Sequence, residues 1–456
     1  MKQAQSPPPP LDDSNRSAER QAWQARALDE AARALLADDS RHFFTQSLST
    51  PCLNGVRAAH GIYIEDLADR RYMDFHGNSV HHVGHAHPQI IAAIKAQLDT
   101  LTFAPRRYAN APATQLARAL ATIAPPGLTK CLFAPSGNDA MEIALRLARG
   151  TTGRHKTVGF RGAFHGAGVA ASTVGGEALF RDRSAGVLPP GASHVAPPAC
   201  YRCPYGMAPA AGCCMNAVRA IRDILQEGDV AAVVAAPVSA ADYVPPSGFW
   251  RAVRAACDEF SSLLIFDEVQ TGLGKTGRMF ACDHDGVAPD VLVLGKALGG
   301  GILPLAAVIA RAELDLLGDI AIGHFTHEKN PVLAAAGLAT LDVIRDDGLV
   351  ERARVLGKLG LDRGRELAAR PGLVGDVRGL GLHITVDLVS DRVAKARACE
   401  AAEKILYLAL DRGLSIKVSA GSVLLLSPPL IIREEELERA FAIIDECLTI
   451  VESGTA

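Results

Sequence analysis

The sequence lacks a surplus of either charge and lacks long apolar runs. Its 47 Lys and Arg residues nearly balance 50 Asp and Glu residues, for a formal net charge of -3. A nucleic-acid-binding chain carries a basic surplus or stripe, so we expect no nucleic-acid partner. A membrane-spanning helix needs about 20 consecutive apolar residues. No run in the sequence reaches that length, so we expect no membrane partner either.

The first residues lack the apolar region of a secretory signal. They are polar up to Ser6, and four prolines follow. The Pro-rich, polar composition of residues 1–16 predicts a disordered tail. Ten cysteines in a chain without such a signal favour reduced thiols. We therefore expect a cytoplasmic location.

The chain otherwise has the composition of a globular protein, with 48% hydrophobic and 21% charged residues. Its 456 residues suggest about two to three domains. A helical pattern runs from Ala18 to about Ala37, and two short strands are expected within 61–75. From about residue 85, helices alternate with short apolar strands. These strands are expected at 130–134, 157–160, 230–236, 262–267 and 290–294.

Apolar strands between helices predict an α/β fold with a mostly parallel sheet that is covered on both faces. After about residue 335 the pattern changes to a long helix, strands near 374–378 and 382–387, and further helices. We predict a large domain of residues 85–335 and a smaller α+β domain of residues 336–456. Residues 17–84 are expected to join the smaller domain.

Two segments suggest binding sites for a phosphate group and for an aromatic ring. Residues 134–140 read Ala-Pro-Ser-Gly-Asn-Asp-Ala between a strand and a helix. Small residues let the backbone approach an anion, and a helix N-terminus offers free N–H groups. Phe164, within residues 162–166, is able to stack on an aromatic ring. Each segment alone also fits a plain helix cap or a core phenylalanine.

Two further segments carry charged side chains that suit catalysis. Asp267 ends an apolar strand, at the place where open α/β sheets bind ligands. A carboxylate there keeps a pyridine nitrogen protonated and makes the ring an electron sink. Lys296 follows the next apolar strand, and burial lowers the pKa of a lysine and makes it nucleophilic. The alternative interpretations are that Asp267 is only a helix cap and that Lys296 is only a solvated lysine at a strand end.

The order of these four segments resembles the pyridoxal 5'-phosphate (PLP) enzymes of fold type I, specifically the class III aminotransferase family, over about residues 45–450. Further matching segments are Asp74-Phe with 84–88, 267–278 and Phe325-Thr326. The resemblance implies PLP as cofactor and a large domain built on a mostly parallel seven-stranded sheet. It also implies a homodimer with shared active sites.

The resemblance also implies roles for single residues. Lys296 is the expected Schiff-base lysine, and Asp267 pairs with the pyridine nitrogen; both are expected to be catalytic. Residues 136–138 hold the phosphate, Phe164 stacks on the ring and Gln270 lies near the ring hydroxyl. Thr326 reaches the phosphate of the neighbouring subunit. The full expected cofactor set is Ser136, Gly137, Asn138, Phe164, His165, Asp267, Gln270, Lys296 and Thr326.

The chain departs from the family at two positions. Many members switch substrates with a Glu in a Glu-Pro-Val segment and an Arg near the C-terminus. Here Ala236 stands in place of that Glu, and residues 423–426 are Val and three leucines without an Arg. Losing one partner would leave a buried unpaired charge, at a cost on the order of 3–5 kcal/mol, so losing both is self-consistent. The enzyme then uses another amino acceptor, or it has no second half-reaction.

A lyase needs no acceptor, and the family includes lyases of phosphoethanolamine, phosphohydroxylysine and 1-hydroxy-2-aminoethylphosphonate. Residues 74–84 and 326–331 most resemble the lyases of the last substrate. We hypothesise a PLP-dependent ammonia-lyase that converts (R)-1-hydroxy-2-aminoethylphosphonate to phosphonoacetaldehyde and ammonia, with Lys296 as the base. The alternatives are an ω-aminotransferase using pyruvate or another keto acid, an ethanolamine-phosphate-type phospho-lyase, a racemase or epimerase, and a PLP-free interaction protein.

A phosphonate needs cationic or N–H donors. The candidate substrate-binding residues are Asn78, Ser79, Arg106, Arg107 and Lys329. The arginine pair also fits a solvated surface, and Lys329 is expected to act from the partner chain.

Other side chains have an open role. His81 and His82 are either structural or catalytic. A Cys-rich segment invites a zinc, disulfide or free-thiol interpretation, and we expect no metal because two of its cysteines are adjacent. Its cysteines are Cys200, Cys203, Cys213 and Cys214.

Overall fold

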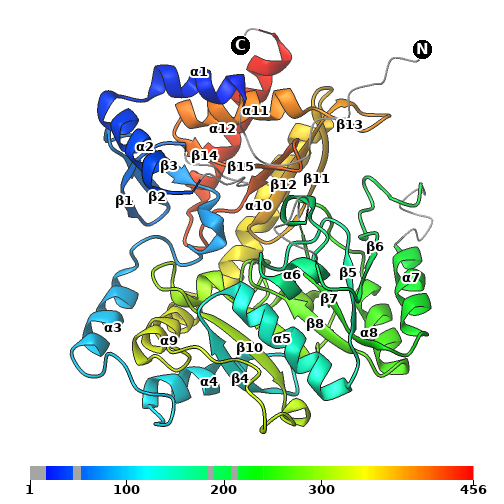
Figure 1. Ribbon diagram of the computed structural model, residues 1–456. Helices are drawn as coiled ribbons and strands as arrows, with labels where there is room; N and C mark the ends of the chain where they lie inside the picture. The colour runs from blue at the N-terminus through cyan, green and yellow to red at the C-terminus, as the bar shows by residue number, and fades with distance from the viewer. Residues whose placement is uncertain (1–16, 45–52, 182–187, 207–213, 240, 455–456) are drawn as a thin grey trace.

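The computed structural model describes residues 17–44, 53–181, 188–206, 214–239 and 241–454. The expected tail of residues 1–16 lies outside the described residues. Figure 1 shows two parts, with the elements from both ends of the chain above and the elements from the middle of the chain below. In the described part of the chain, no helix is long and apolar enough to cross a membrane.

A seven-stranded sheet forms the centre of the lower part, in the order β4-β10-β9-β8-β7-β5-β6. Strand β10 runs antiparallel to both of its neighbours, and the five strands from β9 to β6 run parallel. The mostly parallel seven-stranded sheet is thus confirmed. Its strands are β4 (Leu128–Ala134), β5 (Lys156–Phe160), β6 (Ala192–Val195), β7 (Val230–Ala235), β8 (Leu263–Asp267), β9 (Val291–Leu294) and β10 (Ala306–Arg311).

Apolar side chains fill both faces of this sheet, because successive strand residues point to opposite sides. Ile265 belongs to one apolar cluster, whereas its neighbours Leu264 and Phe266 belong to the other. Helix α5 supplies much of the cluster around Ile265. The helices of this part are α3 (Pro88–Leu98), α4 (Ala111–Ile123), α5 (Gly137–Thr152), α6 (Val169–Val174), α7 (Met215–Leu225), α8 (Phe249–Glu259) and α9 (Pro331–Asp346).

The upper part contains two smaller sheets. In one, β3 from the N-terminal segment pairs in parallel with β14 from the C-terminal segment. In the other, the order is β11-β12-β16-β15, with β13 paired to β12. The strands are β1 (Val56–His60), β2 (Tyr63–Asp66), β3 (Arg71–Asp74), β11 (Val374–Leu380), β12 (His383–Asp391), β13 (Ala396–Arg397), β14 (Leu414–Ser415), β15 (Lys417–Ser419) and β16 (Val423–Leu426).

The helices of the upper part cover these sheets (Figure 1). The helical pattern expected over residues 18–37 is confirmed, and the chain forms two helices there with a break at Leu28. Asp29 starts the second helix by accepting a hydrogen bond from the Ala32 N–H at 2.8 Å, and a capping Asp favours a helix start over continuation. The helices are α1 (Ala18–Ala27), α2 (Glu30–His42), α10 (Leu349–Ala369), α11 (Cys399–Asp411) and α12 (Glu434–Glu452).

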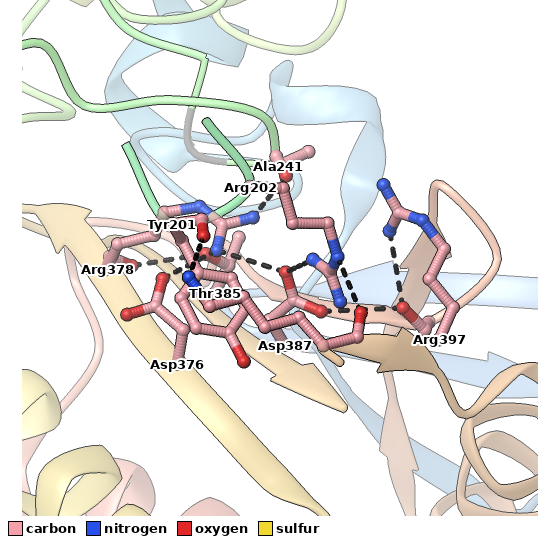
Figure 2. A network of polar contacts seen from close by, with 10 residues as sticks. Tyr201, Arg202, Ala241, Asp376, Arg378, Thr385, Asp387 and Arg397 are labelled. Carbon is pink, nitrogen blue, oxygen red and sulfur yellow. Dashed lines mark hydrogen bonds and ion pairs between the residues drawn. The ribbon is translucent and has the colours of Figure 1, made fainter. Parts of the chain in front are cut away.

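A buried carboxylate joins the two parts (Figure 2). Asp387 on β12 is fully buried and forms ion pairs with Arg202 and, at 3.1 Å, with Arg378. Arg202 lies in the loop before α7, and Arg378 also donates to the carbonyl of Ala241. Lys395 donates to the carbonyl of Tyr201 at 2.6 Å in the same network. One aspartate therefore helps hold two loops of the large domain against the small domain's sheet.

We expect Asp387→Asn to lower the free energy of unfolding by about 3 kcal/mol, because removing one partner of a buried ion pair leaves the other charges uncompensated. Urea denaturation of the purified holoenzyme measures this. Asp362→Asn is the control, since it disrupts only the exposed pairs with Lys358 and Arg365 on α10. An equal effect of the two substitutions would contradict the role of Asp387.

A second set of buried polar side chains lies under the loop that follows β3. His81, His82 and His383 are each at most 2% exposed. Burial lowers the pKa of His81 to about 4, that of His383 to about 3 and that of His82 well below its usual value. Lys275 is fully buried, donates to the carbonyls of Ser427 and Pro428 at 3.2 and 2.6 Å, and has its pKa lowered to about 7 by burial. These histidines are neutral in the folded protein.

The buried histidines predict a loss of stability on mild acidification. Below a pH of about 6.5 the unfolded chain binds protons that the buried histidines of the folded protein do not bind. Each such histidine lowers the free energy of unfolding by up to about 1.4 kcal/mol per pH unit. Glu268, whose pKa burial raises to about 7, acts in the opposite direction, whereas His76, whose pKa burial lowers to about 4, adds to the effect of the three histidines. We therefore expect the urea midpoint of the holoenzyme to fall between pH 7 and pH 5.

The pH dependence has a matched test. His383→Leu should flatten the decline, whereas His60→Leu, at an exposed position on β1, should leave it unchanged. A midpoint that is constant or rises from pH 7 to pH 5 would contradict the assignment of neutral buried histidines.

Candidate active site

Three of the expected site residues follow strands that end at the same edge of the large sheet. Because β10 is antiparallel to both β4 and β9, those two strands point in one direction, and β8 runs parallel to β9. Ser136, Asp267 and Lys296 therefore come together at the carboxyl edge, where α/β sheets bind ligands. The sequence predicts this placement, and the strand order brings it about.

Close backbone packing fixes the relative positions of these segments. A Cβ on Gly295 would lie 3.5 Å from the Cα of Gly137 and 3.3 Å from a methyl of Val269. A Cβ on Gly137 would lie 3.1 Å from the same side chain. The loops that carry Ser136, Asp267 and Lys296 are thus in direct contact through small residues and one valine.

The loop after β4 has the form of an anion site. Ser136 caps α5, accepting from the Asp139 N–H at 3.2 Å and donating to its carboxylate at 2.6 Å. A helix of 16 residues presents free N–H groups and a positive dipole end there. The Asn138 amide accepts from the Gly168 N–H at 2.6 Å, which ties this loop to the one that contains Phe164.

Asp267 is oriented by two hydrogen bonds. Its carboxylate accepts from the Val269 N–H at 3.1 Å and from His165 Nδ1 at 2.8 Å. His165 is 3% exposed, and its Nε2 lacks a hydrogen-bond partner among the described residues. Phe164 is 48% exposed and packs against Phe180 at a centroid distance of 4.5 Å. The stacking role of Phe164 stays a prediction.

Lys296 has the properties of an amine that reacts in its neutral form. Burial lowers its pKa, the carboxylate of Asp267 opposes that shift, and the positive charge of Lys417 adds to it. Its backbone is left-handed, with φ of 46°, a conformation that costs a non-glycine residue on the order of 1 kcal/mol and persists where the surroundings enforce it. Lys296 lies between β9 and a run of three glycines, residues 299–301.

The loop between Phe75 and Val80 is also strained. Gly77, Asn78 and Ser79 have consecutive positive φ values of 42°, 46° and 59°. Ser79 is buried and accepts from Gln270 Nε2 at 3.4 Å, whereas Asn78 is exposed. The structure therefore joins Ser79, an expected substrate residue, to Gln270, an expected cofactor residue.

The other expected substrate residues lie in an exposed cluster with Thr326. Arg106 pairs with Glu328 at 3.2 Å, and the backbone carbonyl of Lys329 accepts from Asn110 at 2.9 Å. Arg107, Thr326 and Lys329 are exposed. Among the described residues, no hydrogen bond or ion pair joins this cluster to Lys296. Its expected role thus requires that it face a site on another chain, as the resemblance implied for Thr326.

The sequence reasoning missed two residues near Lys296, namely His76 and Lys417. The charge of Lys417 acts on both Lys296 and His76, and the charge of Lys296 also acts on His76. The signal for Lys417 was a lysine within an otherwise apolar strand pattern, Leu414-Ser-Ile-Lys-Val. That pattern alone does not tell which strand end faces the site.

The Cys-rich segment is described in part. Cys200 and Cys214 place their Sγ atoms 2.7 Å apart, and Cys213 lies outside the described residues. Within the described chain, the one group with the spacing of metal ligands is Asp74, His81 and His85. The Asp74 carboxylate already accepts from the N–H groups of residues 76 and 77 and from the His85 ring at about 3 Å each, so its oxygens serve to shape this loop.

The donor set at the sheet edge fits PLP. A capped helix N-terminus suits the phosphate, a buried lysine of lowered pKa suits the carbonyl carbon, and Asp267 is held by His165 where a pyridine nitrogen needs a carboxylate. His165 Nε2 is an unsatisfied polar atom beside them. The side chains offer an anion site, a nucleophile and a counter-charge in one place.

Comparisons with known proteins agree with this geometry. The chain is 37% identical to an (R)-1-hydroxy-2-aminoethylphosphonate ammonia-lyase from Vibrio splendidus (strain 12B01), over 96% of this chain and 95% of that protein. It is 36% identical to a leucine/methionine racemase from Thermococcus litoralis, over 85% of this chain and 89% of that protein. The relatives thus differ in reaction type.

A solved structure shares the fold. The PLP-bound amine transaminase from an uncultivated Pseudomonas species superposes with a TM-score of 0.81 at 29% identity, and the match covers 87% of this chain and 94% of that one. The family model for class III aminotransferases matches residues 45–448. The chain therefore belongs to the class III aminotransferases, a family of PLP-dependent enzymes of fold type I.

Proposed function

We propose that this enzyme is an ammonia-lyase that converts (R)-1-hydroxy-2-aminoethylphosphonate to phosphonoacetaldehyde and ammonia without an amino acceptor. The observation that carries the proposal is the absence of both halves of the substrate-switching ion pair. Residue 236, directly after β7, is Ala, and the strand β16 holds only Val and Leu. The similarity to the lyase from Vibrio splendidus supports it.

The environment of β16 also favours a reaction without an acceptor. Leu424 and Leu425 are at most 4% exposed and are packed within the small domain's core. The carbonyl of Ala236 accepts from the Tyr243 hydroxyl at 2.8 Å. These positions offer no charged group to the α-carboxylate of a glutamate donor, so they do not serve the second half of a glutamate-dependent transamination.

The proposed chemistry divides between Asp267 and Lys296. When bound, PLP supplies an electron sink for the carbon that carries the amine. Asp267, oriented by His165, would keep the pyridine nitrogen of the bound cofactor protonated. The neutral amine of Lys296 removes a proton from the aminated carbon. The C–O bond of the neighbouring carbon breaks, and the oxygen leaves as water after taking up a proton.

The balance of the reaction requires neither an oxidant nor an amino acceptor. Loss of water leaves an unsaturated amine, and its hydrolysis consumes one water and releases ammonia and the aldehyde. The aldehyde and ammonia together therefore contain the same atoms as the hydroxylated amine. A transaminase, by contrast, retains the amino group on its cofactor until a keto acid removes it.

We also propose that the enzyme acts as a homodimer with shared sites. The exposed Thr326 cluster, with Arg106 and Lys329, has cationic and hydroxyl groups that the site around Lys296 on the same chain does not use. A neighbouring chain that presents this cluster would add phosphate ligands. The expected cytoplasmic location remains a prediction.

We expect catalytic release of ammonia and aldehyde when the holoenzyme is incubated with (R)-1-hydroxy-2-aminoethylphosphonate and no keto acid. A lyase regenerates its cofactor in every turnover, so product should exceed enzyme many-fold. Ammonia is measured with glutamate dehydrogenase after the protein is removed, and the aldehyde by derivatisation.

Two results would overturn this proposal. One is turnover only after pyruvate or 2-oxoglutarate is added, with one equivalent of aminated cofactor formed otherwise, which would indicate an ω-aminotransferase. The other is release of inorganic phosphate from phosphoethanolamine at a higher kcat/KM, which would indicate a phospho-lyase. The same protein preparation serves all three assays.

We expect Lys296→Ala to abolish both catalysis and covalent attachment of the cofactor. Borohydride reduction followed by peptide mass analysis should label Lys296 in the natural enzyme and no lysine in the variant. Lys358→Met, an exposed position on α10, is the control and should be labelled at Lys296 as in the natural enzyme. Labelling of another lysine in the natural enzyme would refute the assignment.

A further inference from the structure

We propose that Lys417 and His76 form the subsite that binds the anionic group of the substrate and so select phosphonate-bearing amines. This inference deepens the proposed function and rests on it for the identity of the substrate. Neither residue belongs to the motifs that define the cofactor site. They come from segments 341 residues apart in sequence, and the small domain's sheets bring them together.

Backbone pairing places the two residues side by side. The Phe75 N–H donates to the Ser415 carbonyl at 2.9 Å, and the Ser427 N–H donates to the Phe75 carbonyl at 2.8 Å. His76 directly follows Phe75, and Lys417 begins β15 two residues after Ser415. The loop that holds His76 is therefore held between the strand that leads to Lys417 and the end of β16.

His76 presents an unsatisfied polar atom at this point. Its Nε2 is buried and has no hydrogen-bond partner among the described residues. Burial and the charge of Lys417 lower the pKa of His76 to about 4, although Asp74 acts in the opposite direction. The ring is therefore neutral at pH 7, with a single N–H, and Asn78 also hydrogen-bonds to the ring. In the tautomer that carries this hydrogen on Nε2, an oxygen-rich anion would accept from it.

The local charges favour an anion. Lys417 and Lys296 both lie near His76, and Asp74, the acidic group that acts on His76, already accepts hydrogen bonds from two backbone N–H groups and from His85. A phosphonate would add negative charge beside these two lysines. It would relieve the repulsion between the two lysines while accepting from Lys417 and His76.

The size of the substrate requires the anion subsite to lie beside Lys296. In a hydroxylated aminoethylphosphonate, the amine and the phosphonate sit on adjacent carbons, so the phosphonate cannot reach far from the reacting amine. Lys417 meets this requirement, since its charge acts on Lys296 itself. The exposed residues Arg106 and Lys329 have no hydrogen bond or ion pair that reaches Lys296 in the described chain, so they serve this role less directly.

The position of Lys417 also explains how the missing arginine is compensated. Lys417 pairs with Leu425 across β15 and β16, and β16 is the strand in which many family members carry the arginine that binds a carboxylate. A lysine is a compact point charge that binds phosphate-type anions, and an arginine fork binds both carboxylates and phosphates. A cation on the neighbouring strand thus moves the positive charge to a different place in the site.

The binding test uses the holoenzyme and methylphosphonate, a probe without an amine. We expect isothermal titration to show binding that Lys417→Met weakens by about 10-fold or more, as expected for a charge-assisted contact. Lys417→Arg should retain most of the affinity, and the remote control Lys358→Met should bind as the natural enzyme does. Lys417→Gln, which keeps a polar side chain, serves if the methionine variant folds poorly.

A kinetic test separates recognition from folding. Lys417→Met should raise KM for the hydroxylated aminophosphonate about 10-fold or more, with the cofactor's absorbance spectrum unchanged. His76→Phe should behave similarly, and His76→Asn, which keeps an N–H donor, should recover part of the affinity. If the two residues had only a structural role, the variants would have a lower kcat or a lower cofactor content, and they would not show a raised KM with an unchanged spectrum.

The outcomes distinguish the subsite from the proposed function. Methylphosphonate binding that depends on Lys417, with no release of ammonia from the aminophosphonate, would support the subsite and refute the lyase. Catalytic ammonia release with unchanged KM in Lys417→Met would support the lyase and overturn the subsite. Failure of the natural holoenzyme to bind methylphosphonate would also overturn the subsite.

Discussion

The rest of the structure depends on the close approach of three loops at the carboxyl edge of the large sheet. Gly137 and Gly295 lie almost in backbone contact, with Val269 packed against both. This contact places a capped helix N-terminus, a buried carboxylate and a buried lysine in one small volume. A Cβ at either glycine would crowd the Val269 side chain, so the small residues allow these loops to pack closely.

Around this rigid edge, the small domain supplies charges that the family motifs do not define. His76 and Lys417 come from opposite ends of the chain, and the pairing of β3 with β14 brings their segments together. The cofactor side of the site is therefore built by one domain, and the side where substrate groups differ is built by another. The relatives of the chain include a lyase, a racemase and a transaminase.

Buried polar groups connect the two domains, and they are costly unless they are satisfied. The Asp387 network does this with several paired charges, whereas the histidines beneath the active site do it by remaining neutral. Lys275 contributes in a third way, with its amine held by two backbone carbonyls. Neutral histidines and a lysine of lowered pKa limit the positive charge beneath the site, where the carboxylate of Asp74 has its pKa held low.

The sequence by itself determined five of the seven strands of the large sheet, the positions of Asp267 and Lys296 at strand ends, and the loss of the switching ion pair, because each of these is a local pattern. The strands β6 and β10 were found only in the structure. It indicated a helical N-terminal segment but not the break between its two helices, where Asp29 caps the second one. It did not show which chain's site Arg106 faces, so the substrate role of Arg106 stays a prediction. The roles of His76 and Lys417 were decided only by the tertiary structure, since strand pairing between distant segments sets the distance over which their charges act.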